Sequence, residues 1–119
     1  MSRSVEMHKS MIRRLKKNPE AIREELTASD VDLMHMALGM AGETGECVDL
    51  VKKSVINGHP VDRIKMGLEL GDVMFYVHGM AMILGLNLEE ILRANNMKLN
   101  KRYPEGYSDT ASIKREDVA

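Results

Sequence analysis

The chain has 119 residues, a formal net charge of −1 and a single cysteine, Cys47. This length fits one domain with a modest core, and the balanced charge gives no general reason to expect nucleic acid or a membrane as partner. One cysteine excludes a disulfide within the chain, and no N-terminal apolar segment has the form of a signal peptide, so a cytoplasmic location is expected. Eleven methionines beside 3% aromatic residues favour packed helices over a sheet.

The first predicted element is a basic amphipathic helix over residues 4–17. Its apolar positions include Val5, Ile12 and Leu15, and they alternate with lysines and arginines. A solvated face is favoured over a surface for nucleic acid, because the Glu-rich stretch from Glu20 to Glu25 neutralises the charge. Asn18-Pro19 then begins a short helix that extends to Leu26.

The second long helix is predicted from Val31 to about Ile56, after capping residues at 27–30 and before Asn57-Gly58. At about 100° per residue, one stripe of this helix combines polar groups with two glycines. Its members are His35, Gly39, Gly42, Glu46 and Lys53, with Glu43 just beside them. A glycine inside a helix costs about 1 kcal/mol relative to alanine, so some gain should offset it. Close helix packing and room for a ligand beside the acids are both open explanations.

Two acid-x-x-acid pairs dominate the chemistry of the chain. Glu43 and Glu46 form the first pair, and Glu69 and Asp72 form the second in a helix predicted over 61–84. Three residues along a helix turn by about 300°, so each pair projects from nearly one face. A lone pair of this kind is usually solvated surface charge, but here apolar residues surround the acids, and such acids require an explanation.

Two such helices packed antiparallel would bring the four carboxylates together, where a counter-charge would have to offset their repulsion. Oxygen ligands without cysteine or a nearby histidine favour Mg²⁺ or Mn²⁺ over zinc. Tyr76 lies on the same stripe as Glu69, either as a core aromatic or as a wall over a nucleobase, and His35 is a second candidate wall residue. Lys53 is a candidate contact for the leaving group, with a solvent-facing lysine as the alternative.

A fourth helix is predicted from its N-cap, Asn87, to about Arg102. Asn95, Lys98 and Arg102 share one face of it, and amide and basic groups in that arrangement suit phosphate oxygens. Lysine and arginine are also favoured near a helix C-terminus by the helix dipole, which is the alternative explanation. The polar residues 108–119 are predicted to form a flexible tail.

Three segments together resemble the MazG-like nucleotide pyrophosphohydrolases of the all-α NTP pyrophosphatase superfamily. They are Leu38-Gly39-Met40-Ala41-Gly42-Glu43-Thr44-Gly45-Glu46, Glu69-Leu70-Gly71-Asp72-Val73, and the run from Asn95 through Lys98 and Arg102 to Tyr103-Pro104-Glu105-Gly106-Tyr107. The resemblance covers about residues 31–107. Many relatives carry a further glutamate at the position of Gly42, so any additional acid would have to come from elsewhere, such as Asp49.

The resemblance implies a four-helix-bundle-like all-α fold, here with an additional N-terminal helix, in a single domain over residues 1–119. It implies that Mg²⁺ binds to Glu43, Glu46, Glu69 and Asp72, and that Asn95, Lys98 and Arg102 contact the substrate. The implied reaction cleaves the bond between the α and β phosphates of a nucleoside triphosphate, and the implied assembly is a homodimer or homotetramer.

Glu43, at the edge of the ligand stripe, is the favoured general base, and Glu46 is the second candidate catalytic carboxylate. One alternative from another class is a noncatalytic helical protein that senses nucleotides on the same scaffold. A ferritin-like di-iron protein is disfavoured because no Glu-x-x-His pair is present.

Overall fold

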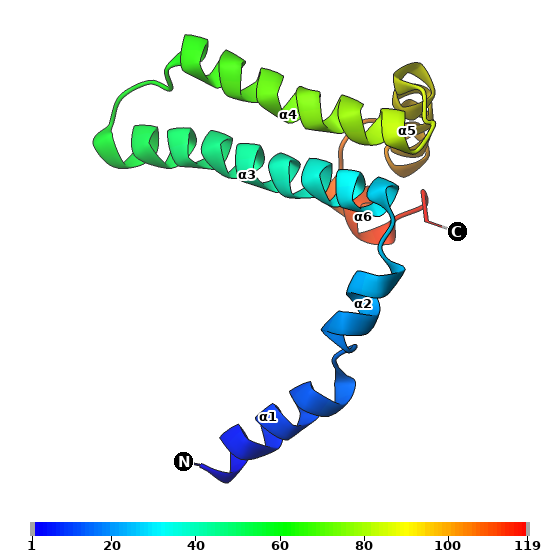
Figure 1. Cartoon of the computed structure of the whole chain (residues 1–119). Helices are drawn as coiled ribbons and strands as arrows, with labels where there is room; N and C mark the ends of the chain where they lie inside the picture. The colour runs from blue at the N-terminus through cyan, green and yellow to red at the C-terminus, as the bar shows by residue number, and fades with distance from the viewer. Residues whose placement is uncertain (1, 119) are drawn as a thin grey trace. The chain divides into compact units, whose positions relative to one another are not determined.

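In the computed structural model, which describes residues 2–118, all regular secondary structure is helical. The six helices are α1 (Arg3–Leu15), α2 (Pro19–Glu25), α3 (Ala28–Asn57), α4 (Arg63–Ile83), α5 (Leu88–Arg102) and α6 (Asp109–Lys114), shown in Figure 1. No strand occurs in the described part of the chain, so the predicted all-α class with an additional N-terminal helix is confirmed.

The chain divides into two compact units, Met1–Val31 and Asp32–Ala119. In the first unit, the Asn18 side chain caps α2 by accepting a hydrogen bond from the backbone N–H of Glu20 at 2.8 Å. An ion pair of 2.7 Å joins Lys17, which precedes this helix, to Glu25, its last residue. That residues 1–119 form a single domain stays a prediction.

Helix α3 begins three residues earlier than its apolar pattern predicts. The Thr27 hydroxyl accepts a hydrogen bond from the Asp30 N–H at 3.1 Å, and the Asp30 carboxylate accepts one from the Thr27 N–H at 2.9 Å. This reciprocal capping satisfies donors at the start of the helix and adds a first turn before Val31. The helix ends at Asn57, where Gly58 adopts a φ of +69° and donates its N–H to the Ser54 carbonyl at 2.9 Å.

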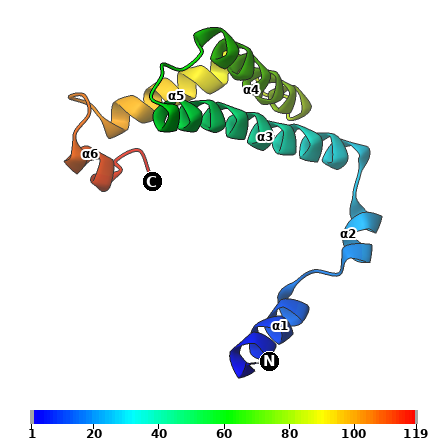
Figure 2. The ribbon, with the colours of Figure 1, turned by 90° about the vertical axis from the view of Figure 1, so that its left-hand side faces the viewer.

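Helices α3 and α4 lie side by side and antiparallel, as Figures 1 and 2 show. Asp62 caps α4 by accepting from the Lys65 N–H at 3.0 Å, so the helix begins at Arg63 and not at Val61. Gly85, with a φ of +67°, follows its end, and α5 then bends away from α4 by 103°.

No described helix is by itself long and apolar enough to cross a membrane, although α4 and α5 taken together across their bend meet the length and composition for it.

A short helix and a buried ion pair organise the residues after Tyr107. The Ser108 hydroxyl accepts from the Ala111 N–H at 3.0 Å and caps α6. Beyond this helix, the Asp117 side chain has no exposed surface and pairs with Arg102 at the end of α5. The sequence interpretation missed both features, because six residues carry too little apolar pattern to indicate a helix. The flexibility predicted for residues 108–119 stays a prediction.

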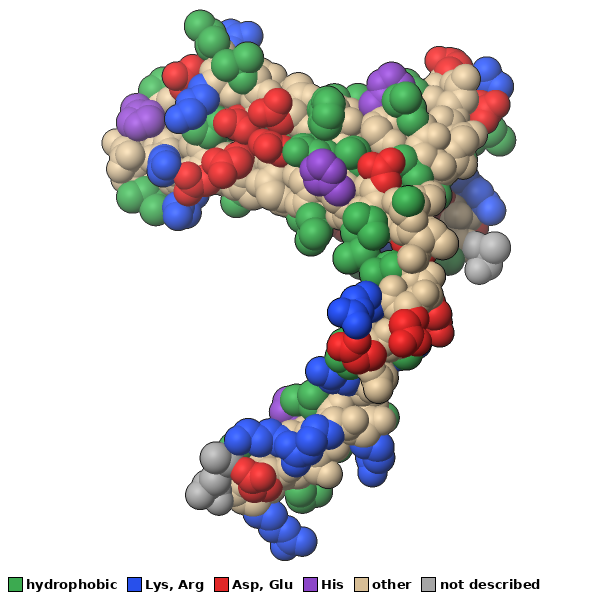
Figure 3. All heavy atoms as spheres, viewed as in Figure 1, with side chains coloured by type: hydrophobic (Ala, Val, Ile, Leu, Met, Phe, Trp, Pro, Cys, Tyr) green, Lys and Arg blue, Asp and Glu red, His purple; other side chains and the backbone are tan. Residues whose placement is uncertain are grey.

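Very few side chains are buried. Among the described residues, Ala81 is the only buried hydrophobic residue and Ser54 the only buried polar one. Large hydrophobic side chains on α3 and α4 are open to solvent instead, and Figure 3 shows several of them on one face. Such exposure exceeds the scattered apolar surface that is usual for a monomer.

Candidate functional site

Three carboxylates from α3 and α4 meet between the two helices. Glu43 of α3 and Glu69 and Asp72 of α4 each offer an oxygen, and these oxygens lie within 4.8 Å of one another. Glu43 and Glu69 are half-buried and Asp72 is exposed. Acidic side chains gather visibly along the α3–α4 pair in Figure 3. The antiparallel packing brings together acids from both predicted pairs.

The crowding of negative charge changes the protonation of Glu43. A hydrogen bond with Glu69 raises the pKa of Glu43 above its ordinary value, and partial burial and the charges of Asp72, Glu69 and Glu46 raise it further. A hydrogen bond between two carboxyl groups requires a proton on one of them. The raised pKa reflects the negative charge gathered around Glu43, and a bound cation would offset that charge.

The donor set fits a small hard cation. Mg²⁺ is commonly bound by one or two carboxylates together with waters and substrate phosphates, and it does not need a complete protein cage. Three carboxylate oxygens on the partly open flank of two helices supply such a site. Sulfur and imidazole ligands are absent from the cluster, which argues against zinc.

Glu46 lies beside the cluster and does not complete it. Its charge contributes to the raised pKa of Glu43, but the group of oxygens within 4.8 Å contains only three of the four predicted ligands. Glu46 is exposed on α3, one turn beyond Glu43. Its predicted roles as a metal ligand and catalytic carboxylate stay predictions.

An aromatic group adjoins the acids. The ring of Tyr76 lies directly against Gly39, and a Cβ atom at position 39 would overlap ring carbons of Tyr76. His35 meets the same ring edge-on with 6.2 Å between centroids, and Phe75 does so at 5.1 Å. Gly39 thus supports the close-packing explanation for the glycines.

Gly42 differs from Gly39, although both lie on the same stripe. A Cβ atom at position 42 would have no atom within 4 Å, so the space beside Glu43 is open. This openness fits the second explanation, which is room for a ligand beside the acids. Close packing therefore explains Gly39, whereas room for a ligand fits Gly42. The sequence had left both explanations open for both glycines.

Lys53 and Asp49 neutralise each other on α3. The Lys53 ammonium lies 2.8 Å from the Asp49 carboxylate, and Lys52 lies 3.4 Å from it. The hydrogen bond with Lys53 lowers the pKa of Asp49, and that same bond raises the pKa of Lys53. Asp49, considered as a replacement acid for the site, is thus held by lysines, and it does not belong to the cluster. Contact of Lys53 with a leaving group stays a prediction.

The predicted phosphate contacts on α5 stand apart from the acids. Asn95 and Lys98 are exposed, and Figure 2 shows α5 leaving the α3–α4 pair, with α6 at its far end. The Arg102 guanidinium donates to both oxygens of Asp117, at 2.9 and 2.8 Å. Contact of Asn95, Lys98 and Arg102 with the substrate stays a prediction.

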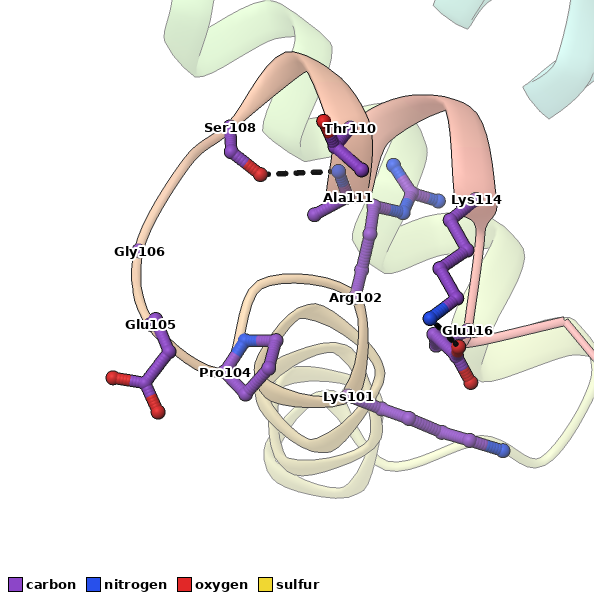
Figure 4. A pocket seen from close by; sticks show the side chains of 10 residues that line it. All are labelled: Lys101, Arg102, Pro104, Glu105, Gly106, Ser108, Thr110, Ala111, Lys114 and Glu116. Carbon is purple, nitrogen blue, oxygen red and sulfur yellow. Dashed lines mark hydrogen bonds and ion pairs between the residues drawn. The ribbon is translucent and has the colours of Figure 1, made fainter.

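A pocket of about 430 Å³ lies between the end of α5 and α6. Figure 4 shows Arg102 extending alongside Ala111, Lys114 turned to Glu116, and Lys101 pointing away. Two of the three cations that line this pocket pair with acids, Arg102 with Asp117 and Lys114 with Glu116 at 3.0 Å.

Clustered carboxylates on adjacent helices of an all-helical domain are typical of candidate metal-binding proteins. The divalent ions that such carboxylates bind also bind phosphate groups. Within that class, the model of the MazG nucleotide pyrophosphohydrolase domain matches residues 32–107. The chain belongs to this family, as the three sequence segments predicted.

A phage protein provides a second comparison. The chain is 35% identical over 78 residues to the Gene 37 protein of Mycobacterium phage L5, covering 62% of this chain and 68% of that protein. No solved structure matches the chain.

Proposed function

We propose that this protein is a Mg²⁺-dependent nucleoside triphosphate pyrophosphohydrolase. The reaction adds water across the bond between the α and β phosphates and yields a nucleoside monophosphate and pyrophosphate. The observation that carries the proposal is the meeting of Glu43, Glu69 and Asp72 between two helices of a MazG-family domain. Mn²⁺ is the alternative ion, because it accepts the same oxygen ligands.

The carboxylates would bind Mg²⁺ and accept the proton of the attacking water. Glu69 and Asp72 on α4, with Glu43 on α3, would bind Mg²⁺, which supplies positive charge for the phosphate oxygens. Glu43, at the edge of the ligand stripe of α3, is the proposed general base for the attacking water. Glu46, one turn away, would support Glu43 through its charge or serve as an outer ligand.

The substrate contacts proposed on α5 require an assembly of chains or a movement of α5. Asn95 and Lys98 are exposed and available to a phosphate or sugar, whereas Arg102 reaches a phosphate only if its pair with Asp117 opens. The exposed apolar side chains on α3 and α4 support a homodimer or homotetramer. In such an assembly, α5 of one protomer would approach the acid cluster of another.

The experiment that tests the function measures pyrophosphate release from ribonucleoside and deoxyribonucleoside triphosphates with Mg²⁺, with Mn²⁺ and with a chelator. We expect turnover of at least one substrate, dependent on the metal and abolished by Glu69→Gln. Full activity of the Glu69→Gln variant would reject the assigned site. Nucleotide-dependent thermal stabilisation without turnover of any substrate would favour the noncatalytic nucleotide sensor instead.

A further inference from the structure

We infer that Gly39 is a positioning residue that holds the Tyr76 ring in place as the wall against which the nucleoside of the substrate packs. This inference rests on the proposed function and deepens it. The inference gives a role to a glycine inside α3 that has no side chain with which to contact the substrate.

The register of the helices places this contact next to the acids. Gly39 precedes Glu43 by four residues on α3, and Tyr76 follows Asp72 by four residues on α4. Because the two helices run antiparallel, these steps of one turn go in the same spatial direction. The Gly39–Tyr76 contact is therefore the layer of side chains directly beside the carboxylate cluster, about 6 Å further along the pair.

The contact depends on the absence of a side chain at position 39. A Cβ atom there would overlap three ring carbons of Tyr76, far inside ordinary van der Waals separation. The ring also meets His35 and Phe75 edge-on, so its present position is defined from several sides. Tyr76 is only partly buried, which leaves room for the ring to move outward when Gly39 is replaced.

The position of the ring suits the nucleoside part of the substrate. When the carboxylates hold the ion and its phosphates, the sugar and base extend from the α phosphate to a neighbouring layer of the helix pair. A partly exposed tyrosine ring in that layer offers a stacking surface, and the exposed His35 adds a polar edge. Open space at Gly42 leaves the intervening backbone accessible.

A purely structural role for Gly39 makes a different prediction. If Gly39 only allowed α3 and α4 to pack, replacing it would separate the helices and disturb the carboxylates, and binding of all polyphosphates would weaken together. If Gly39 positions Tyr76 as a nucleoside wall, only ligands that carry a nucleoside lose affinity. Tripolyphosphate has the phosphate chain without the nucleoside and separates the two cases.

The experiment compares Gly39→Ala with Gly45→Ala, a matched glycine of the same helix whose Cβ atom would meet nothing within 4 Å. Calorimetry with Mg²⁺ measures binding of nonhydrolysable α,β-imido nucleoside triphosphates and of tripolyphosphate. We expect Gly39→Ala to weaken nucleotide binding about fivefold or more and to change tripolyphosphate binding less than twofold. Gly45→Ala should leave both affinities unchanged. Equal losses for both ligands, or no loss, would overturn the inference.

A second pair of variants covers the case in which Gly39→Ala fails to fold. Tyr76→Ala removes the ring and should weaken nucleotide binding to the same extent, and adding Gly39→Ala to it should cause no further loss. A further loss would show that Gly39 acts by another route. Wild-type protein that binds the analogues but hydrolyses no substrate would refute the enzymatic function and leave this test intact, whereas failure to bind any analogue would refute the inference.

Discussion

Arg102 and Asp117 form a bidentate ion pair that ties the end of α5 to the residues beyond α6. The two hydrogen bonds measure 2.9 and 2.8 Å, and Arg115 adds two more to the same carboxylate, at 3.2 and 3.4 Å. Two planar guanidinium groups thus bind this carboxylate, and the Asp117 side chain has no exposed surface. The predicted phosphate contact of α5 is thus engaged by the chain's own carboxylate.

Replacing Asp117 with asparagine should release α6. The variant keeps the size of the side chain but removes the charge that both arginines bind, so we expect backbone amides of α6 to exchange with solvent roughly tenfold faster. Hydrogen exchange followed by mass spectrometry measures this. Glu116→Gln is the matched control, because Glu116 is exposed and pairs only with Lys114. Unchanged α6 exchange in Asp117→Asn would contradict the importance of this pair.

The same ion pair should resist acid. The hydrogen bond from Arg102 holds the pKa of Asp117 well below the ordinary carboxyl value, and Arg115 lowers it further. A group with a lowered pKa in the folded state contributes its full stabilisation above the pKa of the unfolded state and loses it as the pH falls through the folded-state pKa. Protection of α6 should therefore persist through about pH 4 and fall only in stronger acid. Loss of this protection already near pH 5 would disagree.

Stabilisation of the protein by Mg²⁺ should increase with pH. Glu43 has a raised pKa, so its contribution to stability is fully present at low pH, when it is protonated, and is lost as the pH rises through that pKa. A bound cation would offset the repulsion between the ionised carboxylates above that pKa. We expect a larger Mg²⁺-induced rise in melting temperature at pH 8 than at pH 5. Thermal unfolding at both pH values, with Glu43→Gln as control, measures the difference, and an equal rise at both would count against a metal at this cluster.

The loss of activity on replacing an acid should depend on whether its carboxylate belongs to the three-oxygen cluster. Glu69 supplies one of the three close oxygens and Glu46 does not. We expect Glu69→Gln to lower kcat at least about a hundredfold, and Glu46→Gln to have a clearly smaller effect, on the order of tenfold. Steady-state kinetics with saturating Mg²⁺ measures both. Equal losses would show that Glu46 is a full ligand in the working enzyme.

Sequence patterns predicted the features that depend on the spacing of neighbouring residues along the chain. Helix bounds at Asn57 and Arg102 follow from glycine and proline signals, and the two acid pairs follow from a three-residue step along a helix. Capping by Asp30 and Asp62 shifted two helix starts by two or three residues, since side-chain bonds to the backbone override apolar periodicity.

Such patterns do not predict contacts between residues that are far apart in the sequence. The different surroundings of Gly39 and Gly42 depend on where Tyr76 of another helix falls, and both glycines look alike in the sequence. The Arg102–Asp117 pair joins residues fifteen positions apart across a turn and a short helix. Only the packed chain shows which candidate cation of α5 already has a partner.

An exposed apolar stripe on α4 should hold protomers together. Ile64, Leu68, Phe75 and Met82 fall within about 40° of one line along this helix and are 64–81% exposed. Because Leu68 is 69% exposed, replacing it with aspartate removes few contacts within the chain but would bury a charge in an interface.

We therefore expect Leu68→Asp to weaken self-association at least about tenfold, as measured by light scattering of a dilution series. The matched control is Ile113→Asp, which changes an 83% exposed isoleucine on α6, outside the stripe. A wild-type protein that is monomeric at all concentrations, or a Leu68→Asp variant that associates like wild type, would show that this stripe is not the interface. If dissociation also removes pyrophosphohydrolase activity while Ile113→Asp keeps it, the acid cluster requires a second chain for function.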